Sequence, residues 1–309
     1  MSRLALAALI LEAGFGYPER LDRRIPHPVN ALGAAISALE RRWNRQQRAE
    51  GERRALGVAT VALVAGGAAL AGAIAARVLR DRRAGAAGLA ALATVGLAQR
   101  SLYDHVAAVL APLERGDLAA ARTAVARIVG RDTNNLDETG VAAAALESLA
   151  ESFNDGVVAP ALWLAAAGLP GLFAYKAVNT ADSLIGHREP RWRAFGWAAA
   201  RADDAMNLFP ARLAGALIVA AAGGRGGGIM RRDAPRHASP NAGWPEAAMA
   251  GALGVRLGGP AAYDGVLTDR PTFGDGPRPT ARDLRRGLAL YVRACALLWL
   301  VTGAVAWRR

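Results

Sequence analysis

Long apolar blocks alternate along the chain with short segments rich in acids, amides and arginine. The clearest block, 55–76, carries no charge and consists mostly of Ala, Val, Leu and Gly. A helix needs roughly 20 apolar residues to span a bilayer, so this block predicts a membrane-spanning helix. Weaker blocks of the same kind predict further spans over 84–99, 156–175, 208–222 and 287–307.

Two other regions do not follow this pattern. The segment 4–13 is too short to span a bilayer alone and is expected either to lie in the interface or to enter the bilayer partway. The stretch 223–282 is rich in Gly, Pro, Asp and Arg, which predicts a polar loop region with one short helix over about 245–257 and no strands of useful length. The pattern predicts an all-α, polytopic membrane protein with about four to six membrane-embedded helices, forming one domain over 1–309. A soluble, Ala-rich helical bundle is the alternative.

The formal net charge of +12 fits a membrane protein better than a nucleic-acid-binding one. The arginines do not alternate with aromatic side chains that could stack on bases. Their densest runs, in 41–54 and 77–83, flank the first apolar block as juxtamembrane charge does. Because both flanks are basic, the charge distribution does not choose an orientation. The single cysteine, Cys295, excludes an internal disulfide and a cysteine metal cluster.

One lysine, Lys176, stands among 38 basic residues, and all the others are arginine. A compact ammonium suits a phosphate oxygen in a tight pocket where a planar guanidinium would not fit. The composition therefore indicates a phosphate-binding role for this lysine. The alternative is that it is a chance survivor in an arginine-rich chain.

An acidic helix is predicted to follow the loop 131–137, with Asp132 or Thr133 as its N-cap. Like charges on one helix face repel unless solvent or a cation lies between them, and Mg²⁺ binds one or two carboxylates together with substrate phosphates. The face is therefore either a metal site or solvated. Its carboxylates recur at i, i+4 and i+8: Glu147, Glu151 and Asp155, with Asn154 beside them.

Three more polar clusters follow, each next to an apolar block. The last of them joins arginines and a Ser-Pro-Asn turn to a helix N-terminus, an arrangement that favours phosphate or carboxylate binding. The clusters are Lys176, Asn179 and Asp182; then Asp203, Asp204 and Asn207; then Arg231, Arg232, Arg236, His237, Ser239 and Asn241.

Familiar short motifs do not explain these clusters. The chain contains no G-x-x-x-x-G-K-[ST] loop and no dinucleotide-binding glycine motif after a strand. The segment 132–140 lacks the glycine and the terminal glutamate of an EF-hand. The four histidines have no H-E-x-x-H spacing, so a zinc site is not expected.

Taken together, the polar clusters resemble the CobD/CbiB family of cobalamin biosynthesis over nearly the whole chain. Six separate motifs in the family's order make the resemblance specific. They are "PHPVNALGAAI" (26–36), "VGRDTNNLDETGV" (129–141), "ESLAESFNDGVVAP" (147–160), "AYKAVNTADSLIGH" (174–187), "FGWAAARADDAMNLFPARL" (195–213) and "HASPNAGWPEAAMAGALGVRLGG" (237–259).

The resemblance implies an integral membrane enzyme that uses ATP and Mg²⁺. Members of the family join aminopropanol or its phosphate to the f-side-chain carboxylate of (adenosyl)cobyric acid. The resemblance further implies a multi-pass protein of the bacterial inner membrane, with its active face in the cytoplasm. Its expected partners are the corrinoid, the amine and membrane lipid, with possible association with other cobalamin-assembly enzymes, and no nucleic acid.

This chemistry assigns expected roles to the polar residues. The expected ligands of Mg²⁺ or of the amine are Glu147, Glu151 and Asp155. Lys176 is expected to bind a phosphate. The metal and amine pocket is completed by Asn179, Asp182, Asp203, Asp204 and Asn207, and the substrate contacts include Asn154. The residues expected to bind phosphate or corrinoid carboxamides are Arg231, Arg236, His237, Ser239 and Asn241. Asn134 and Asp137 are expected to order a loop over the site.

Two non-catalytic functions remain as alternatives. A corrinoid transporter would explain polar residues inside apolar helices. A membrane scaffold for soluble cobalamin-assembly enzymes would use the polar motifs as docking surfaces. The sequence does not say whether the amine substrate is free or phosphorylated.

Overall fold

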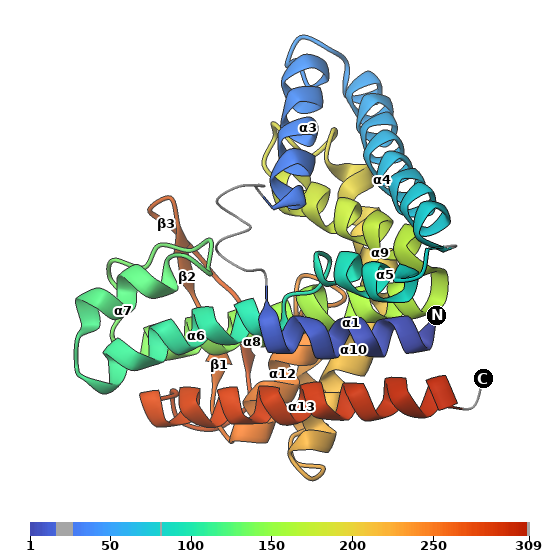
Figure 1. The fold of residues 1–309 in the computed structure, drawn as a ribbon. Helices are drawn as coiled ribbons and strands as arrows, with labels where there is room; N and C mark the ends of the chain where they lie inside the picture. The colour runs from blue at the N-terminus through green and yellow to red at the C-terminus, as the bar shows by residue number, and fades with distance from the viewer. Residues whose placement is uncertain (17–26, 81, 308–309) are drawn as a thin grey trace. The chain divides into compact units, whose positions relative to one another are not determined.

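The computed structural model describes residues 1–16, 27–80 and 82–307 and is mostly helical (Figure 1). It divides into two compact units, each assembled from separate segments of the chain. The first unit contains Met1–Ala98, Ala159–Asn207 and Thr302–Arg309. The second contains Gln99–Val158 and Leu208–Val301.

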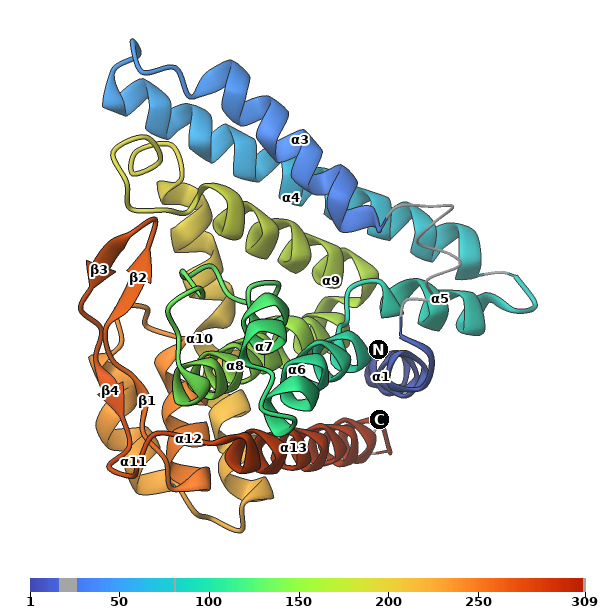
Figure 2. The same ribbon diagram turned by 90° about the vertical axis from the view of Figure 1, so that its left-hand side faces the viewer.

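The first unit is a set of closely packed helices. Helix α4 packs along α9, and α3 packs against both, so the three helices run side by side (Figure 2). Gly72 of α4 allows the approach to α9, because a Cβ there would lie 2.7 Å from the Leu169 carbonyl carbon. Gly57 of α4 likewise meets the chain just before α10, where a Cβ would lie 1.9 Å from the Phe195 oxygen. The helices are α1 (Ser2–Phe15), α3 (Pro28–Trp43), α4 (Glu50–Arg80), α5 (Gly85–Thr94), α9 (Ala159–Ile185) and the first part of α10 (Trp197–Ala221).

Helix α9 consists of two helical segments. Gly168 adopts a left-handed backbone conformation (φ 66°) that interrupts the helix. Pro170 follows, and it cannot donate a backbone hydrogen bond. The second segment begins here and carries the polar cluster that starts at Lys176.

The second unit is built around the buried helix α8. Every residue of 140–147 is buried, and Gly287 of α13 would clash with the Leu146 side chain if it carried a Cβ. Phe153 packs edge-on against Tyr291, with their ring centroids 5.6 Å apart. Its helices are α6 (Gln99–Glu114), α7 (Leu118–Val125), α8 (Glu138–Phe153), the π-helix η1 (Asn154–Val158), the rest of α10, α11 (Gly227–Asp233), the 3₁₀-helix η2 (Ala234–Arg236), α12 (Gly243–Leu253) and most of α13 (Ala281–Trp307).

Four short strands also belong to the second unit. They form two antiparallel pairs, one that joins β1 to β4 and one that joins β2 to β3. The prediction of a loop region with one helix and no strands over 223–282 was therefore incomplete, since α11 and these strands lie within it. The strands are β1 (Leu257–Gly258), β2 (Ala261–Tyr263), β3 (Val266–Thr268) and β4 (Thr272–Phe273).

Four helical stretches are long and apolar enough to cross a membrane. They cover the predicted blocks that begin at 55, 156, 208 and 287, so the chain is a polytopic helical membrane protein, as predicted. The stretches are Glu50–Arg80, Glu138–Ile185, Trp197–Ala221 and Ala281–Trp307.

The predicted span over 84–99 is wrong. Helix α5 has only 10 residues and ends at Thr94, and the chain turns before α6 begins at Gln99. Gly96 lies in this turn against Leu172 of α9, where a Cβ would approach the Leu172 Cδ1 to 2.6 Å. The position where the helix ends thus depends on a tertiary contact, which the hydrophobicity of the local sequence does not indicate.

The predicted N-cap of α8 is also wrong. Asp137, which was expected in the first turn, caps the helix by accepting a 2.6 Å hydrogen bond from the Gly140 backbone N–H. This hydrogen bond lowers the pKa of Asp137. Asp132 instead accepts a hydrogen bond from the backbone N–H of Gly265.

Candidate functional site

Four of the predicted site residues in the first unit form one hydrogen-bonded network between α9 and α10. Asn179 Nδ2 donates to Asp203 Oδ1 at 3.2 Å, and Asn207 Nδ2 donates to Asp203 Oδ2 at 3.0 Å. Tyr175 Oη donates to Asn207 Oδ1 at 3.1 Å. Lys176 Nζ lies 3.4 Å from Asn179 Oδ1. Both oxygens of Asp203 thus accept from amides, and an ammonium stands at one end of the network.

Two more predicted carboxylates lie at the edge of this network. Asp182 is half-buried and interacts electrostatically with Asp203 and Asp204. Arg201 Nη1 lies 3.5 Å from Asp204 Oδ2 and partly neutralises it. The two polar motifs on α9 and α10 therefore meet, as a shared site requires.

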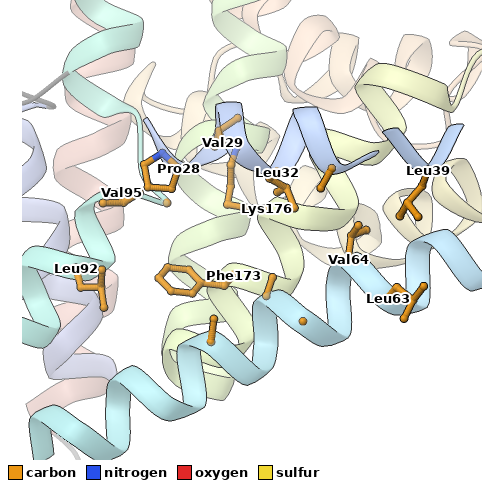
Figure 3. Close-up of a pocket in the computed structure, with 15 residues that line it drawn as sticks. Pro28, Val29, Leu32, Leu39, Leu63, Val64, Leu92, Val95, Phe173 and Lys176 are labelled. Carbon is orange, nitrogen blue, oxygen red and sulfur yellow. The ribbon is translucent and has the colours of Figure 1, made fainter. Parts of the chain in front are cut away.

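Lys176 also lines an apolar cavity of about 570 Å³ in the first unit (Figure 3). The cavity lies between α3, α4, α5 and α9, and among the described residues that line it Lys176 brings the one charged group. This position puts the ammonium at the boundary between an apolar cavity and the polar network, where a compact cation can serve a phosphate. The labelled apolar residues around it are Pro28, Val29, Leu32, Leu39, Leu63, Val64, Leu92, Val95 and Phe173.

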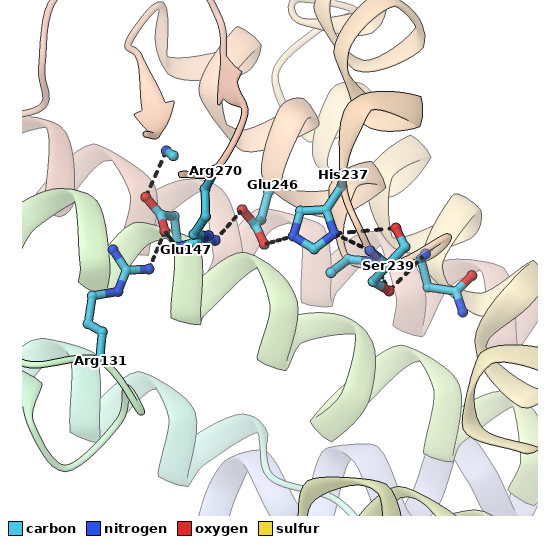
Figure 4. A network of polar contacts seen from close by, with 9 residues as sticks. Arg131, Glu147, His237, Ser239, Glu246 and Arg270 are labelled. Carbon is cyan, nitrogen blue, oxygen red and sulfur yellow. Dashed lines mark hydrogen bonds and ion pairs between the residues drawn. The ribbon is translucent and has the colours of Figure 1, made fainter. Parts of the chain in front are cut away.

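The second unit holds a different network, centred on the buried Glu147 (Figure 4). Oε2 of Glu147 accepts hydrogen bonds from Arg131 and from Arg270 Nη1, the latter at 3.2 Å. Its Oε1 accepts from the backbone N–H of Gly258 at 2.8 Å. The carboxylate is therefore paired with two guanidinium groups, a role that sequence reasoning did not assign to it.

Glu246 continues this network from α12. It is 1% exposed, its Oε1 lies 3.7 Å from His237 Nε2, and its Oε2 lies 3.9 Å from Arg270 Nη2. Among the described residues, Oε2 accepts no hydrogen bond. Burial raises the pKa of Glu246 well above its ordinary value, and the negative charges of Glu147 and Glu151 raise it further.

The turn that precedes α12 is held together from within. His237 Nδ1 accepts a 2.9 Å hydrogen bond from the backbone N–H of Ser239. Ser239 Oγ in turn accepts from the backbone N–H groups of Asn241 and Ala242. Since Arg212 Nη1 donates to Asn241 Oδ1 at 3.3 Å, these side chains already order the turn, and substrate contact by them stays a prediction.

The predicted arginines of this region differ from one another. Arg231 is exposed. Arg236 Nη1 donates to Asp233 Oδ1 at 3.3 Å, while Arg232 binds both oxygens of the same carboxylate. The Arg232 hydrogen bonds lower the pKa of Asp233 to about 2, and a backbone hydrogen bond from Gly274 adds to the effect. These arginines therefore help to fix α11 next to β4.

The end of α8 departs from the expected single helical face. A π-helix, η1, begins at Asn154, so the α-helical i, i+4, i+8 spacing does not extend as far as Asp155. Asn154 is buried and donates to Asp155 Oδ1 at 2.7 Å, while Glu151 is exposed. Short π-helical segments are frequent at functional sites.

The donor groups of the two networks limit how the chain could hold Mg²⁺. In the parts of the chain that the structure describes, no group of three or more His, Cys, Asp or Glu side chains could hold a metal ion by itself. Mg²⁺ bound with a nucleotide needs only one or two protein carboxylates, because phosphates and water complete its shell. The carboxylates beside Lys176 suit that second arrangement better than Glu147, which is paired with arginines.

The comparisons with known proteins agree with the sequence motifs. The family model described as "CobD/Cbib protein" matches residues 5–291. The chain belongs to this family. It is 50% identical over 309 residues to the cobalamin biosynthesis protein CobD of Rhodobacter capsulatus, a match that covers 98% of this chain and 96% of the relative. No solved structure matches.

Relatives of the CobD/CbiB family from other bacteria match along the same length. The chain is 45% identical over 315 residues to the CobD protein of Rhizobium meliloti, with 98% of this chain and 96% of the relative covered. It is 45% identical over 303 residues to that of Brucella suis, with coverages of 94% and 92%. A role in cobalamin biosynthesis follows, and with it a corrinoid substrate.

Sequence reasoning missed several members of the two networks. Glu246 lies inside a quoted motif, but its apolar neighbours gave no sign of chemistry. Arg131 and Arg270 are 16 and 123 residues from Glu147, and no periodicity links such positions. Tyr175 was quoted beside Lys176 and left without a role, although a buried Tyr hydroxyl usually has a hydrogen-bond partner.

Proposed function

We propose that this chain is an ATP-dependent amide ligase. It joins the amine of aminopropanol, or of its phosphate, to the f-side-chain carboxylate of (adenosyl)cobyric acid. Family membership and the names of the relatives support cobalamin biosynthesis. The observation that carries the finer proposal is the network of Lys176, Asn179, Asp203 and Asn207 on two long apolar helices. Polar groups in such helices are costly and mark functional sites.

The reaction requires the activation of an unreactive acid. A carboxylate is a poor acyl donor, because an oxide ion would have to leave. Transfer of the γ-phosphoryl group of ATP to the carboxylate oxygen gives an acyl phosphate and ADP. The amine then attacks the acyl carbon, phosphate leaves with its bonding electrons, and the amine gives up a proton.

Each need of this reaction has a candidate in the first unit. Lys176 would bind the phosphate that is transferred, because its ammonium is the charged group at the apolar boundary. Asp182 or Asp204 would accept the proton of the amine. Asp203, held by two amides, would fix the positions of the other groups.

Mg²⁺ would be held by one or two of these carboxylates together with the nucleotide phosphates, and it would neutralise phosphate charge. We assign the active face to the cytoplasm and the chain to the bacterial inner membrane, since ATP and the corrinoid are cytoplasmic. The metal roles first assigned to Glu147, Glu151 and Asp155 stay predictions.

One reconstituted assay tests the proposal. The purified chain in detergent is mixed with cobyric acid, ATP and Mg²⁺ and with each amine in turn, and the products are analysed by mass spectrometry. The expected product is the corrinoid amide, formed only when ATP is present, with ADP and phosphate in equal amount. If neither amine is incorporated while corrinoid crosses proteoliposomes that contain the chain, a transporter replaces the ligase.

A further inference from the structure

The apolar surface of α4 ends at a stacked arginine and tryptophan. Helix α4 is long enough to span a membrane and exposes apolar side chains along its length, among them Leu63 at 58% and Leu70 at 61%. Such a surface is suited to face lipid. One turn before Val58, the first of these exposed side chains, the guanidinium of Arg54 lies 3.8 Å from the ring centroid of Trp197. Arginine and tryptophan at the end of an apolar stretch mark the level of the lipid headgroups.

Two segments far apart in the sequence meet at this end of α4. The first is the turn between α3 and α4, and the second is the loop between α9 and α10 (Figure 2). Asn44 Nδ2 donates to the carbonyl oxygen of Arg191 at 3.0 Å, and the buried Arg53 donates to the same oxygen. Arg193 Nη2 lies 2.9 Å from Glu50 Oε1. The two segments therefore form one surface of the first unit.

This surface, made of residues 41–54 and 188–197, is called the basic end. It contains nine arginines and three glutamates. Two of the glutamates, Glu50 and Glu52, already pair with arginines of the same surface. An excess of guanidinium groups remains, and such a surface is complementary to anions. The exposed arginines are Arg41, Arg42, Arg45, Arg54, Arg188, Arg191 and Arg193.

The opposite end of α4 has a smaller excess of positive charge. The segment 77–83 carries four arginines, and the residues of α9 that face α4 at Gly72, Leu169 and Pro170, have no charged side chain. The balance of Lys and Arg near the ends of spanning helices sets their orientation, with the richer end in the cytoplasm. The two flanks of α4 leave the orientation open in the sequence, but the fold adds the arginines of the α9–α10 loop to one of them.

We propose that the basic end lies at the cytoplasmic leaflet of the membrane and binds the headgroups of anionic phospholipids. The cytoplasmic leaflet carries the anionic lipids that attract juxtamembrane arginines, and guanidinium groups bind phosphate oxygens in pairs. A lipid is favoured over a soluble anion because the arginines begin where the apolar surface of α4 ends. The inference does not depend on the proposed reaction. It places Asp182, one turn before the end of α9, near the cytoplasmic side.

The accessibility of introduced cysteines tests the orientation. Gln46 is exposed in the turn between α3 and α4, and Ala84 is exposed beyond the other end of α4. Each is changed to cysteine in the full chain, and spheroplasts and inside-out vesicles are treated with a membrane-impermeant maleimide. Gln46→Cys is expected to react only in inside-out vesicles and Ala84→Cys only in spheroplasts. The wild-type chain, whose single cysteine is buried, gives the background. Any other pattern for Gln46→Cys overturns the inference.

A quenching measurement tests the lipid. A fluorophore is attached to Gln46→Cys, and the chain is reconstituted in phosphatidylcholine vesicles that contain spin-labelled phosphatidylglycerol or, for comparison, spin-labelled phosphatidylcholine. The anionic lipid is expected to quench more strongly, because it gathers at the basic end. The triple variant R41Q/R42Q/R45Q in the same chain is expected to lower this preference by at least about fivefold, the effect of losing one juxtamembrane arginine. Equal quenching by the two lipids before these changes overturns the inference.

A matched variant separates local charge from total charge. R80Q/R82Q/R83Q removes the same charge from the other end of α4 and is expected to leave the lipid preference at Gln46→Cys unchanged. Equal effects of the two triple variants would mean that only the net charge matters and would overturn the inference. Stronger quenching by spin-labelled ATP than by the anionic lipid would make the basic end a nucleotide site instead. A chain that keeps its lipid preference but forms no amide contradicts the proposed ligase and leaves this surface intact.

Discussion

Asn179 on α9 donates a 3.2 Å hydrogen bond to Asp203 on α10, and this bond joins two sequence motifs 24 residues apart. Asp203 accepts a second hydrogen bond from Asn207, so amide groups hold both of its carboxylate oxygens in place. A carboxylate fixed in this way is suited to orient a metal ion or a charged substrate.

Replacing Asp203 by Asn is expected to reduce kcat by about 100-fold, because a positioned charge is lost where charge develops in the reaction. The substitution keeps the size of the side chain. Its activity should be compared with that of Asp104→Asn, which changes an exposed acid paired with Arg100. Equal activities of the two variants would remove Asp203 from the site.

Lys176→Arg keeps the positive charge but replaces a compact ammonium by a planar group. If Lys176 binds a nucleotide phosphate, the KM for ATP should rise by about tenfold, in line with the loss of one charge-assisted hydrogen bond. The KM for the corrinoid should not change. Arg100→Lys on α6 is the matched control, and normal turnover of Lys176→Arg with an unchanged KM for ATP would contradict the assignment.

Glu147→Gln is expected to act mainly on stability. It removes the charge partner of Arg131 in a buried ion pair, which costs about 3–5 kcal/mol, whereas Arg270 keeps Glu246 at 3.9 Å. Glu114→Gln breaks the exposed pair with Arg285 and should cost less than about 1 kcal/mol. Thermal or denaturant unfolding in detergent measures both changes.

The same pair of variants decides between two roles of Glu147. If Glu147 is a metal ligand, as the sequence suggested, its substitution should weaken Mg²⁺ binding while the unfolding midpoint stays near that of Glu114→Gln. A loss of stability with unchanged Mg²⁺ affinity would instead support the arginine-bound role seen in the structure.

The raised pKa of Glu246 should make the stability of the protein depend on pH. Its pKa is raised in the folded state, so folding favours the protonated acid, and the free energy of unfolding should fall as pH rises above the ordinary value of 4.5 toward the folded pKa. Glu246→Gln removes the titration and should flatten this slope, with the largest gain in stability at pH 8. A slope identical in both proteins would mean that the buried carboxyl does not titrate in this way.

The membrane helices were readable from the sequence because the length of an apolar run decides them. The block 55–76 has no charge, and no tertiary contact was needed to identify it. The break after Thr94 was not readable, since it depends on Gly96 meeting Leu172 from another helix. The hairpin was missed because its strands have three residues each, although Asp264–Gly265 is a strong turn signal.

The residues of the candidate site were likewise predictable from the sequence only in part. Lys176, Asn179, Asp203 and Asn207 were found because rare polar residue types stood beside apolar blocks, and their meeting in one network needed only two neighbouring helices. Glu147 was found as an acid, but its arginine partners come from distant loops. Sequence patterns identify such a residue and leave its electrostatic partners to the fold.

The absence of a side chain at Gly72 of α4 affects the position of a second helix, α9. Because α4 touches the backbone of α9 at Leu169 and Pro170 there, one added methyl group would push α9 outward just before the turn that bears Lys176 and Asn179. The distance between α4 and the helix that bears Lys176 and Asn179 is thus set by the Cβ atom that a buried glycine lacks.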